Sequence, residues 1–288
     1  PGARDWISLN VHDGAIRGGT VAVNILPGAI QGSRIPDEMM NIAFSVDAMK
    51  LTYLEGLPDI AKLNGSAVLT GDRFKADITS GSVGSVALKN GEFVIDELHK
   101  HGAIGTISGL IAGPTRDMLT IIDRPRLGYP TRFGISPAQS GGTSSVKFSF
   151  AIPMLIGLKA EDVGIDIEAE MKDVKLPIND QLRLTGGTFL IKLDAKGMKS
   201  SGAVQVNGAP MGFTWLEDFT GTLPASTRID VTATLDERHR AGQLILVLKE
   251  AEQFRVDADL GNAGEERYGD KDPDGDHGPG GTIDDGGQ

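Results

Sequence analysis

The chain has 288 residues, of which 40% are hydrophobic, and it contains no cysteine and carries a formal net charge of -11. This length and apolar content are enough to bury a core, while the lack of cysteine excludes a disulfide framework, a thiolate metal site and a cysteine nucleophile. The acidic balance, without any run of Lys and Arg, argues against a nucleic-acid partner.

Residues 1–110 are expected to form a first β-rich half. Apolar Phe74, Ala76 and Ile78 alternate with polar Lys75 and Asp77, a period of two that gives a strand one apolar and one wetted face. Such alternation is typical of antiparallel sheet with one side in water. Gly and Asn pairs along the whole chain are read as turns: Asp13-Gly14, Asn64-Gly65, Thr70-Gly71-Asp72, Asn90-Gly91, Thr185-Gly186-Gly187 and Asn207-Gly208.

Residues 111–145 interrupt this alternation. Between Gly113 and Asp123 the apolar residues recur at 118, 119, 121 and 122, and Pro114 stands where a helix tolerates it, so a short amphipathic helix is predicted near 114–123. Pro125 and Pro130 prevent its continuation. We therefore expect a helix and loop insertion between two β-rich halves.

Residues 146–260 return to alternating strands and make the second half. Apolar side chains that would share a face in each strand are the candidates to line a dry, continuous surface able to accept acyl chains. Over both halves they are Phe74, Ala76, Ile78, Phe148, Phe150, Ile165, Ile167, Leu182, Leu184, Phe189, Ile191, Val204, Val206, Phe213 and Trp215. An ordinary filled core explains the same pattern, and periodicity alone leaves both readings open.

Residues 261–288 form an acidic tail rich in Gly and Asp, which we expect to be flexible. Asp270, Asp272, Asp274 and Asp276 resemble the opening of a calcium loop, but Gly281 stands where the closing carboxylate belongs, which makes them weak metal candidates. His99 and His101 would share a strand face, yet two ligands do not complete a metal site.

No catalytic motif is found: there is no serine elbow, phosphate-binding Gly loop or helical His pair. We expect a protein that is not an enzyme and needs no cofactor. A carbohydrate-handling enzyme is the least favoured reading, because aromatic residues make up only 5% of the chain.

The order of several short features, over about residues 5 to 248, resembles the AsmA-like superfamily of bacterial envelope proteins, in particular its YhdP-like branch. The features that carry the resemblance are Trp6-Ile-Ser-Leu-Asn before Asp13-Gly14, Leu51-Thr-Tyr53 before Leu57-Pro58, Gly113-Pro114 to Ile122-Asp123, Gly128-Tyr129, Ile152-Pro153-Met154, residues 193–208, Phe213-Thr-Trp215 and residues 227–242. The tail after Leu260 departs from the family, where further groove strands are expected.

The resemblance implies a mainly β fold, with an extended antiparallel sheet curved into an open groove or half-pipe. It implies a periplasmic segment that binds phospholipid acyl chains and contributes to phospholipid transport between the inner and outer membranes of a Gram-negative envelope. The parent protein would be tethered to the inner membrane by a segment outside this chain, and the partners would be neighbouring groove segments and other envelope proteins. The first residue, which is not Met, is also consistent with a piece of a longer polypeptide. The alternative is a non-enzymatic structural or protein-interaction β module, which would dock partners through its sheet edges.

Overall fold

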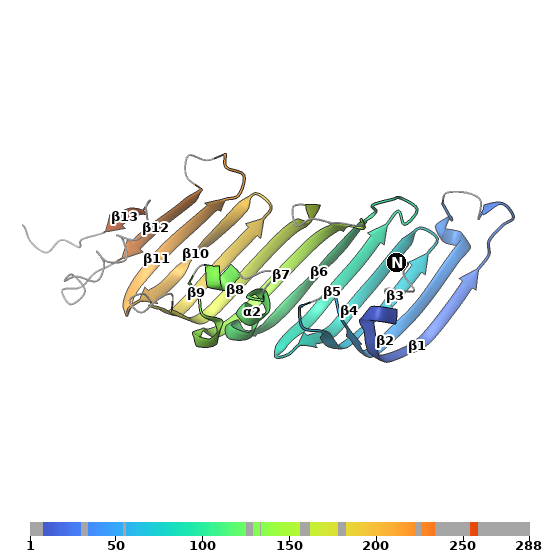
Figure 1. Ribbon diagram of the computed structural model, residues 1–288, viewed down its shortest axis with the longest axis horizontal. Coiled ribbons are helices and arrows are strands. Elements are labelled where there is room, and N and C mark those ends of the chain that lie inside the picture. Colours follow the sequence, from blue (N-terminus) through green and yellow to red (C-terminus); the bar gives the residue numbers. More distant parts are fainter. Residues whose placement is uncertain are drawn as a thin grey trace, which may run out of the picture.

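The computed structural model describes residues 8–29, 34–53, 56–124, 129–132, 134–155, 162–177, 183–222, 226–233 and 254–258. In these residues a single sheet of 13 strands runs in chain order from β1 to β13 (Figure 1). The strands are β1 Val11–Val23, β2 Met40–Leu51, β3 Ile60–Thr70, β4 Arg73–Val83, β5 Val86–Asp96, β6 Ile104–Pro114, β7 Gly141–Pro153, β8 Gly164–Pro177, β9 Arg183–Asp194, β10 Gly197–Val206, β11 Ala209–Asp218, β12 Thr227–Ala233 and β13 Phe254–Ala258.

Every neighbouring pair from β1 to β12 is antiparallel, and β13 lies parallel to β12. The expectation of a mainly β, antiparallel fold is confirmed. The insertion between the halves leaves the sheet unbroken, because β6 pairs directly with β7 from Ile104↔Pro153 to Pro114↔Thr143.

The register of the strands places apolar side chains on one face of the sheet. Residues directly opposite one another share a face, and one such row runs Ala76, Phe93, Ile107, Phe150 and Ile165 across β4 to β8. The next residue in each strand points to the other face, which is polar. We call the first of these the apolar face and the second the polar face.

Two of the predicted turns are confirmed, and four lie inside long strands instead. Thr70-Gly71-Asp72 connects β3 to β4, and Asn207-Gly208 connects β10 to β11 with positive φ at both residues. The other four predicted turns lie within strands, at places where the strand register shifts. They are residues 13–14 in β1, 64–65 in β3, 90–91 in β5 and 185–187 in β9. Those turn predictions were wrong because a β-bulge uses the same permissive residues as a turn.

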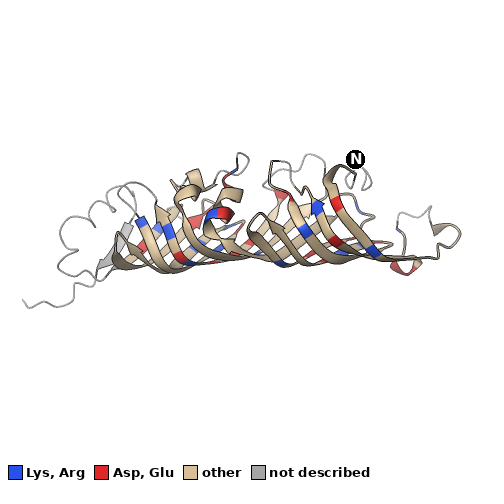
Figure 2. Cartoon of the chain, turned by 90° about the horizontal axis from the view of Figure 1, so that it is seen from below, with Lys and Arg blue, Asp and Glu red and all other residues tan. Residues whose placement is uncertain are grey.

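The bulges line up in neighbouring strands. One row of bulges contains residues of positive φ at Gly14 on β1, Ala48 on β2 and Lys62 on β3. A second row contains them at Gly142 on β7, Asp173 on β8 and Gly187 on β9. Because a bulge bends its strand and increases the local twist, aligned bulges curve a sheet. The sheet accordingly has the form of an open half-pipe that does not close into a barrel, as Figures 1 and 2 show.

Short helices stand over the apolar face. They are α2 Thr115–Ile122 and α3 Tyr129–Arg132, together with the 3-10 turn η3 Pro137–Gln139, while η2 Asp37–Met39 precedes β2. The helix predicted near 114–123 is thus confirmed as α2, with Pro114 in extended conformation just before it. Figure 2 shows the helices between β6 and β7 on one side of the trough.

The best-packed part of the protein lies beneath α2. Its fully buried centre is Val174 on β8, and the other members are Met171, Leu176, Phe189, Val204, Val206, Ala209 and Met211, with Leu119 of α2 and Ile135 packed against them. We call these eight residues the core cluster. In a sheet one layer thick, such burial requires the bend of the strands and the cover of α2 together.

One polar contact fixes α2 to the sheet within this dry region. The Thr115 and Ser144 hydroxyls lie 2.7 Å apart, and Thr115 is fully buried. We expect Thr115→Val to lower the free energy of unfolding by about 1–3 kcal/mol, because the Ser144 hydroxyl then loses its buried partner. The double variant Thr115→Val/Ser144→Ala should cost less than the sum of the two single changes in a chemical denaturation cycle. Additive single effects would contradict this coupling.

Candidate functional site

The apolar face is the first candidate site, and aromatic side chains pack against one another on it. Phe74 and Phe93 meet edge to face with ring centroids 6.0 Å apart, and Phe148 and Phe150 lie 5.5 Å apart. Rings at this spacing attract one another, and the rest of their surface stays apolar and requires no hydrogen-bond partner. This face therefore presents apolar area without directional polar groups.

The structure places the predicted lining residues on this one face. Strand register joins Phe148 to Ile167 and Phe150 to Ile165, and it joins Phe74, Ala76 and Ile78 to the same side of β3 and β5. Farther along the sheet it brings together Leu184 with Val206, Ile191 with Ser200 and Trp215, and Phe189 with Gly202 and Phe213. Leu182 and the acidic residues 270, 272, 274 and 276 lie outside the described residues.

Burial divides the apolar face into a covered and an open part. Phe189, Val204 and Val206 belong to the core cluster and are 4–9% exposed. Phe74, Ile78, Phe148, Phe150, Ile165 and Ile167 remain only half-buried on the same face. No second sheet covers these side chains in the part of the chain that the structure describes, so we call this stretch across β4 to β8 the open apolar stretch.

The sequence pattern did not predict two residues of the open apolar stretch, Phe93 and Ile107. The run Phe93-Val94-Ile95 is continuously apolar, which hides the alternation that would have assigned Phe93 to a face. Only the pairing of β5 with β4 and β6 resolves it.

The polar face is stabilised by cross-strand ion pairs. Lys75 on β4 reaches Glu92 on the neighbouring β5 at 2.9 Å and Asp77 of its own strand at 3.1 Å, and these hydrogen bonds raise the pKa of the Lys75 ammonium. Lys192 on β9 meets Glu168 on β8 at 2.6 Å, which raises the pKa of Lys192 and lowers that of Glu168. Cross-strand pairs of opposite charge add modestly to the pairing of β4 with β5 and of β8 with β9.

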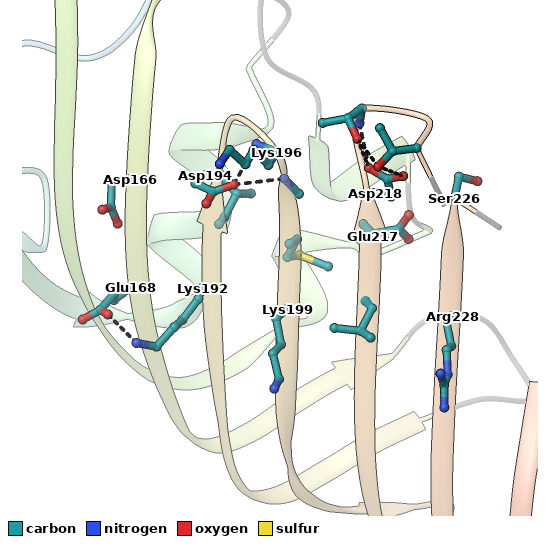
Figure 3. Close-up of a pocket in the computed structure, with 16 residues that line it drawn as sticks. Asp166, Glu168, Lys192, Asp194, Lys196, Lys199, Glu217, Asp218, Ser226 and Arg228 are labelled. Carbon is teal, nitrogen blue, oxygen red and sulfur yellow. Dashed lines mark hydrogen bonds and ion pairs between the residues drawn. The ribbon is translucent and has the colours of Figure 1, made fainter. Parts of the chain in front are cut away.

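A shallow depression of about 870 Å³ lies on the polar face at the upper ends of β8 to β12 (Figure 3). Five acidic and four basic side chains line it, so that its net charge is close to zero. Leu193 and Met198 also line it, although by register they belong to the apolar face, in the row next to Trp215. The depression therefore lies where the two faces meet.

A buried carboxylate holds three connecting segments together at the same rim, near β3 and β4. Asp72 is 3% exposed, and its oxygens accept hydrogen bonds from the His99 backbone N–H and lie 2.7 Å from His99 Nδ1. Arg34 Nε lies 2.6 Å from the second oxygen. Gly71 lets residues 34–39 approach, because a Cβ there would stand 2.4 Å from the Ile35 and Pro36 carbonyl oxygens.

This contact predicts a change of stability with pH. Burial raises the pKa of Asp72, but the hydrogen bonds from His99 and the charge of Arg34 outweigh it and hold that pKa below its ordinary value. A lowered folded pKa stabilises the protein above the unfolded value of about 3.9, and this contribution is lost as the pH falls through the folded value. Asp72→Asn should therefore lower the melting temperature at neutral pH and flatten its decline in acid.

The matched control for Asp72→Asn is Asp47→Asn, which removes the exposed partner of Arg17. Thermal unfolding followed by circular dichroism from neutral to acidic pH compares the two. Equal melting curves for both variants at every pH would contradict a stabilising role of Asp72.

One constellation has the residue types of a catalytic triad but the wrong connections. His12 Nε2 and Asp59 Oδ1 each lie 2.7 Å from the Thr52 hydroxyl, which donates to Asp59. Hydrogen bonds from Thr52 and Lys50 lower the pKa of Asp59, which makes it a weaker base. Nor does His99, which is bonded to Asp72, form a metal site with His101: no group of three His, Asp or Glu ligands occurs among the residues the structure describes.

None of the described helices combines the length and apolar character needed to cross a bilayer. The chain matches no family model, and searches of curated proteins and of solved structures also returned no match.

Proposed function

We propose that this chain is a lipid-binding groove segment whose apolar face holds phospholipid acyl chains. The observation that carries the proposal is the open apolar stretch, which crosses five consecutive strands without a covering layer in the described residues. A sheet normally buries its apolar face against a second layer. Hydrocarbon chains lying along the half-pipe would supply the missing contacts, because apolar burial needs area rather than direction.

The proposed role is a contribution to phospholipid transport between the inner and outer membranes of a Gram-negative envelope. It follows the resemblance of the sequence to the AsmA-like superfamily, and the half-pipe form supports it, since an acyl chain can move along a continuous apolar surface without crossing a polar barrier. The same resemblance suggests a periplasmic location, with an inner-membrane tether outside this chain and neighbouring groove segments as partners.

The second candidate is a structural module that binds a partner by strand addition. It is favoured by β1, which has a neighbouring strand on one side only among the described residues and exposes Ile16 and Val21 by 66% and 71%. Against it, the bulges and Arg17 in β1 interrupt the edge, which is how sheets discourage pairing with another chain.

Native mass spectrometry of the purified chain tests the proposal, followed by solvent extraction and lipid analysis. Bound phospholipid in the folded protein is the expected result. A folded chain that stays free of lipid, even after incubation with phospholipid vesicles, would reject lipid binding and leave the strand-addition module as the better reading.

A further inference from the structure

We propose that the depression at the upper ends of β8 to β12 binds the zwitterionic head group of the phospholipid whose acyl chains lie on the apolar face. The inference rests on the proposed function and adds the chemical class of the lipid. The charged side chains that line the depression differ in whether they have a partner of opposite charge or a hydrogen-bond partner (Figure 3).

The carboxylates of the depression mostly have partners. Asp194 accepts hydrogen bonds from the backbone N–H groups of Lys196 and Gly197, at 2.7 and 3.1 Å. Glu217 accepts them from the Trp215 indole N–H at 2.7 Å and the Thr227 hydroxyl at 2.8 Å. These bonds hold the carboxylates in place while their negative charge remains.

Two cations of the depression have no counterion among the described residues. The side chains of Lys196 and Lys199 form no ion pair with any residue that the structure describes, whereas Lys192 is bound to Glu168 and Arg228 to Asp230. In Figure 3 no dashed line reaches the Lys199 ammonium. A phosphate oxygen is the kind of acceptor that such lysines bind.

The balance of charge selects the class of head group. With five acidic and four basic side chains around it, the depression offers no excess positive charge to an anionic lipid, and the whole chain carries -11. A zwitterion meets both signs: its phosphate can approach Lys196 and Lys199, and its ammonium can approach carboxylates such as Asp166. A head group with a net negative charge would also contact the two lysines, but the carboxylates would repel it.

The position of the depression connects it to the apolar face. Leu193 and Met198 line it, and in the register of β9 to β11 they belong to the row next to Trp215. One molecule can therefore place its polar end in the depression and its hydrocarbon over Trp215. This continuity favours a lipid over a small soluble phosphoester.

The test is competition between two lipids with identical acyl chains. The chain is incubated with vesicles containing equal amounts of phosphatidylethanolamine and phosphatidylglycerol, and the bound lipids are counted by native mass spectrometry. We expect a preference for phosphatidylethanolamine of roughly tenfold, the equivalent of one or two well-placed charge contacts. In Lys196→Ala/Lys199→Ala the phosphate of either lipid loses its contacts, so the amount of bound phosphatidylethanolamine should fall by roughly tenfold, whereas the preference, which comes from the carboxylates, should remain.

The matched control is Lys89→Ala/Lys175→Ala, which removes the same charge from two exposed lysines that do not line the depression. It should bind as much phosphatidylethanolamine as the unmodified chain. An equal loss in both variants, or no preference in the unmodified chain, overturns the head-group site but leaves lipid binding intact. Absence of any bound lipid rejects the proposed function itself. Glycerophosphoethanolamine binding as tightly as the intact lipid would reassign the depression to soluble phosphoesters.

Discussion

Phe93→Asp/Phe148→Asp is expected to abolish most lipid binding without unfolding the chain. Both rings belong to the open apolar stretch and are half-buried, so the carboxylates can reach water when no ligand is present. An acyl chain lying over them would desolvate the charges, which costs several kcal/mol. We expect bound phospholipid to fall by roughly a factor of ten or more, because each 1.4 kcal/mol corresponds to tenfold in affinity.

The control for this pair adds the same two charges to the polar face. Thr106 and Thr188 are exposed there, and Thr106→Asp/Thr188→Asp should bind as much lipid as the unmodified chain. Circular dichroism and thermal unfolding establish that all variants fold. Equal lipid content in the two double variants would show that the apolar face is not where the lipid binds.

Gly187→Ala should produce the largest loss of stability from a single methyl group. Gly187 has a φ of 71° in the bulge of β9, and an added Cβ would stand 1.9 Å from the Ala203 carbonyl oxygen of β10. The backbone conformation alone costs about 1–2 kcal/mol for a residue with a Cβ, and the clash must also displace the β9–β10 pairing. We expect a total of about 3–5 kcal/mol in chemical denaturation.

The neighbouring glycine provides a control for Gly187→Ala. Gly186 has a φ of 65°, but a Cβ there would meet nothing within 4 Å. Gly186→Ala should therefore cost only the backbone term, about 1–2 kcal/mol. Indistinguishable unfolding curves for the two variants would mean that the close approach of β9 and β10 at this bulge does not contribute to the stability of the sheet.

The apolar face could be predicted from the sequence because alternation fixes which side of a strand each residue occupies. Alternation alone assigns Phe148, Phe150, Ile165 and Ile167 to apolar strand faces, and the register of β7 and β8 confirms that they face the same way. The helix at 115–122 was equally accessible, because its apolar spacing differs from that of the strands.

The curvature was not accessible from the residues themselves, because it depends on where turn-like residues fall relative to strand pairing. Asn64-Gly65 and Asn90-Gly91 look like hairpin turns in isolation but continue β3 and β5 through bulges. That Lys196 and Lys199 have no ion pair among the described residues was also hidden, since counterions come from neighbouring strands and no local pattern shows which lysines lack one.

Photocrosslinking along β7 tests most directly whether acyl chains lie on the apolar face. A benzophenone amino acid would replace each residue from Val146 to Ala151 in turn, and the folded chain would be loaded with radiolabelled phospholipid before irradiation. Lipid crosslinks should appear at Val146, Phe148 and Phe150 and be absent at Lys147, Ser149 and Ala151. Crosslinks of equal strength at all six positions, or at none, would contradict a lipid-holding face.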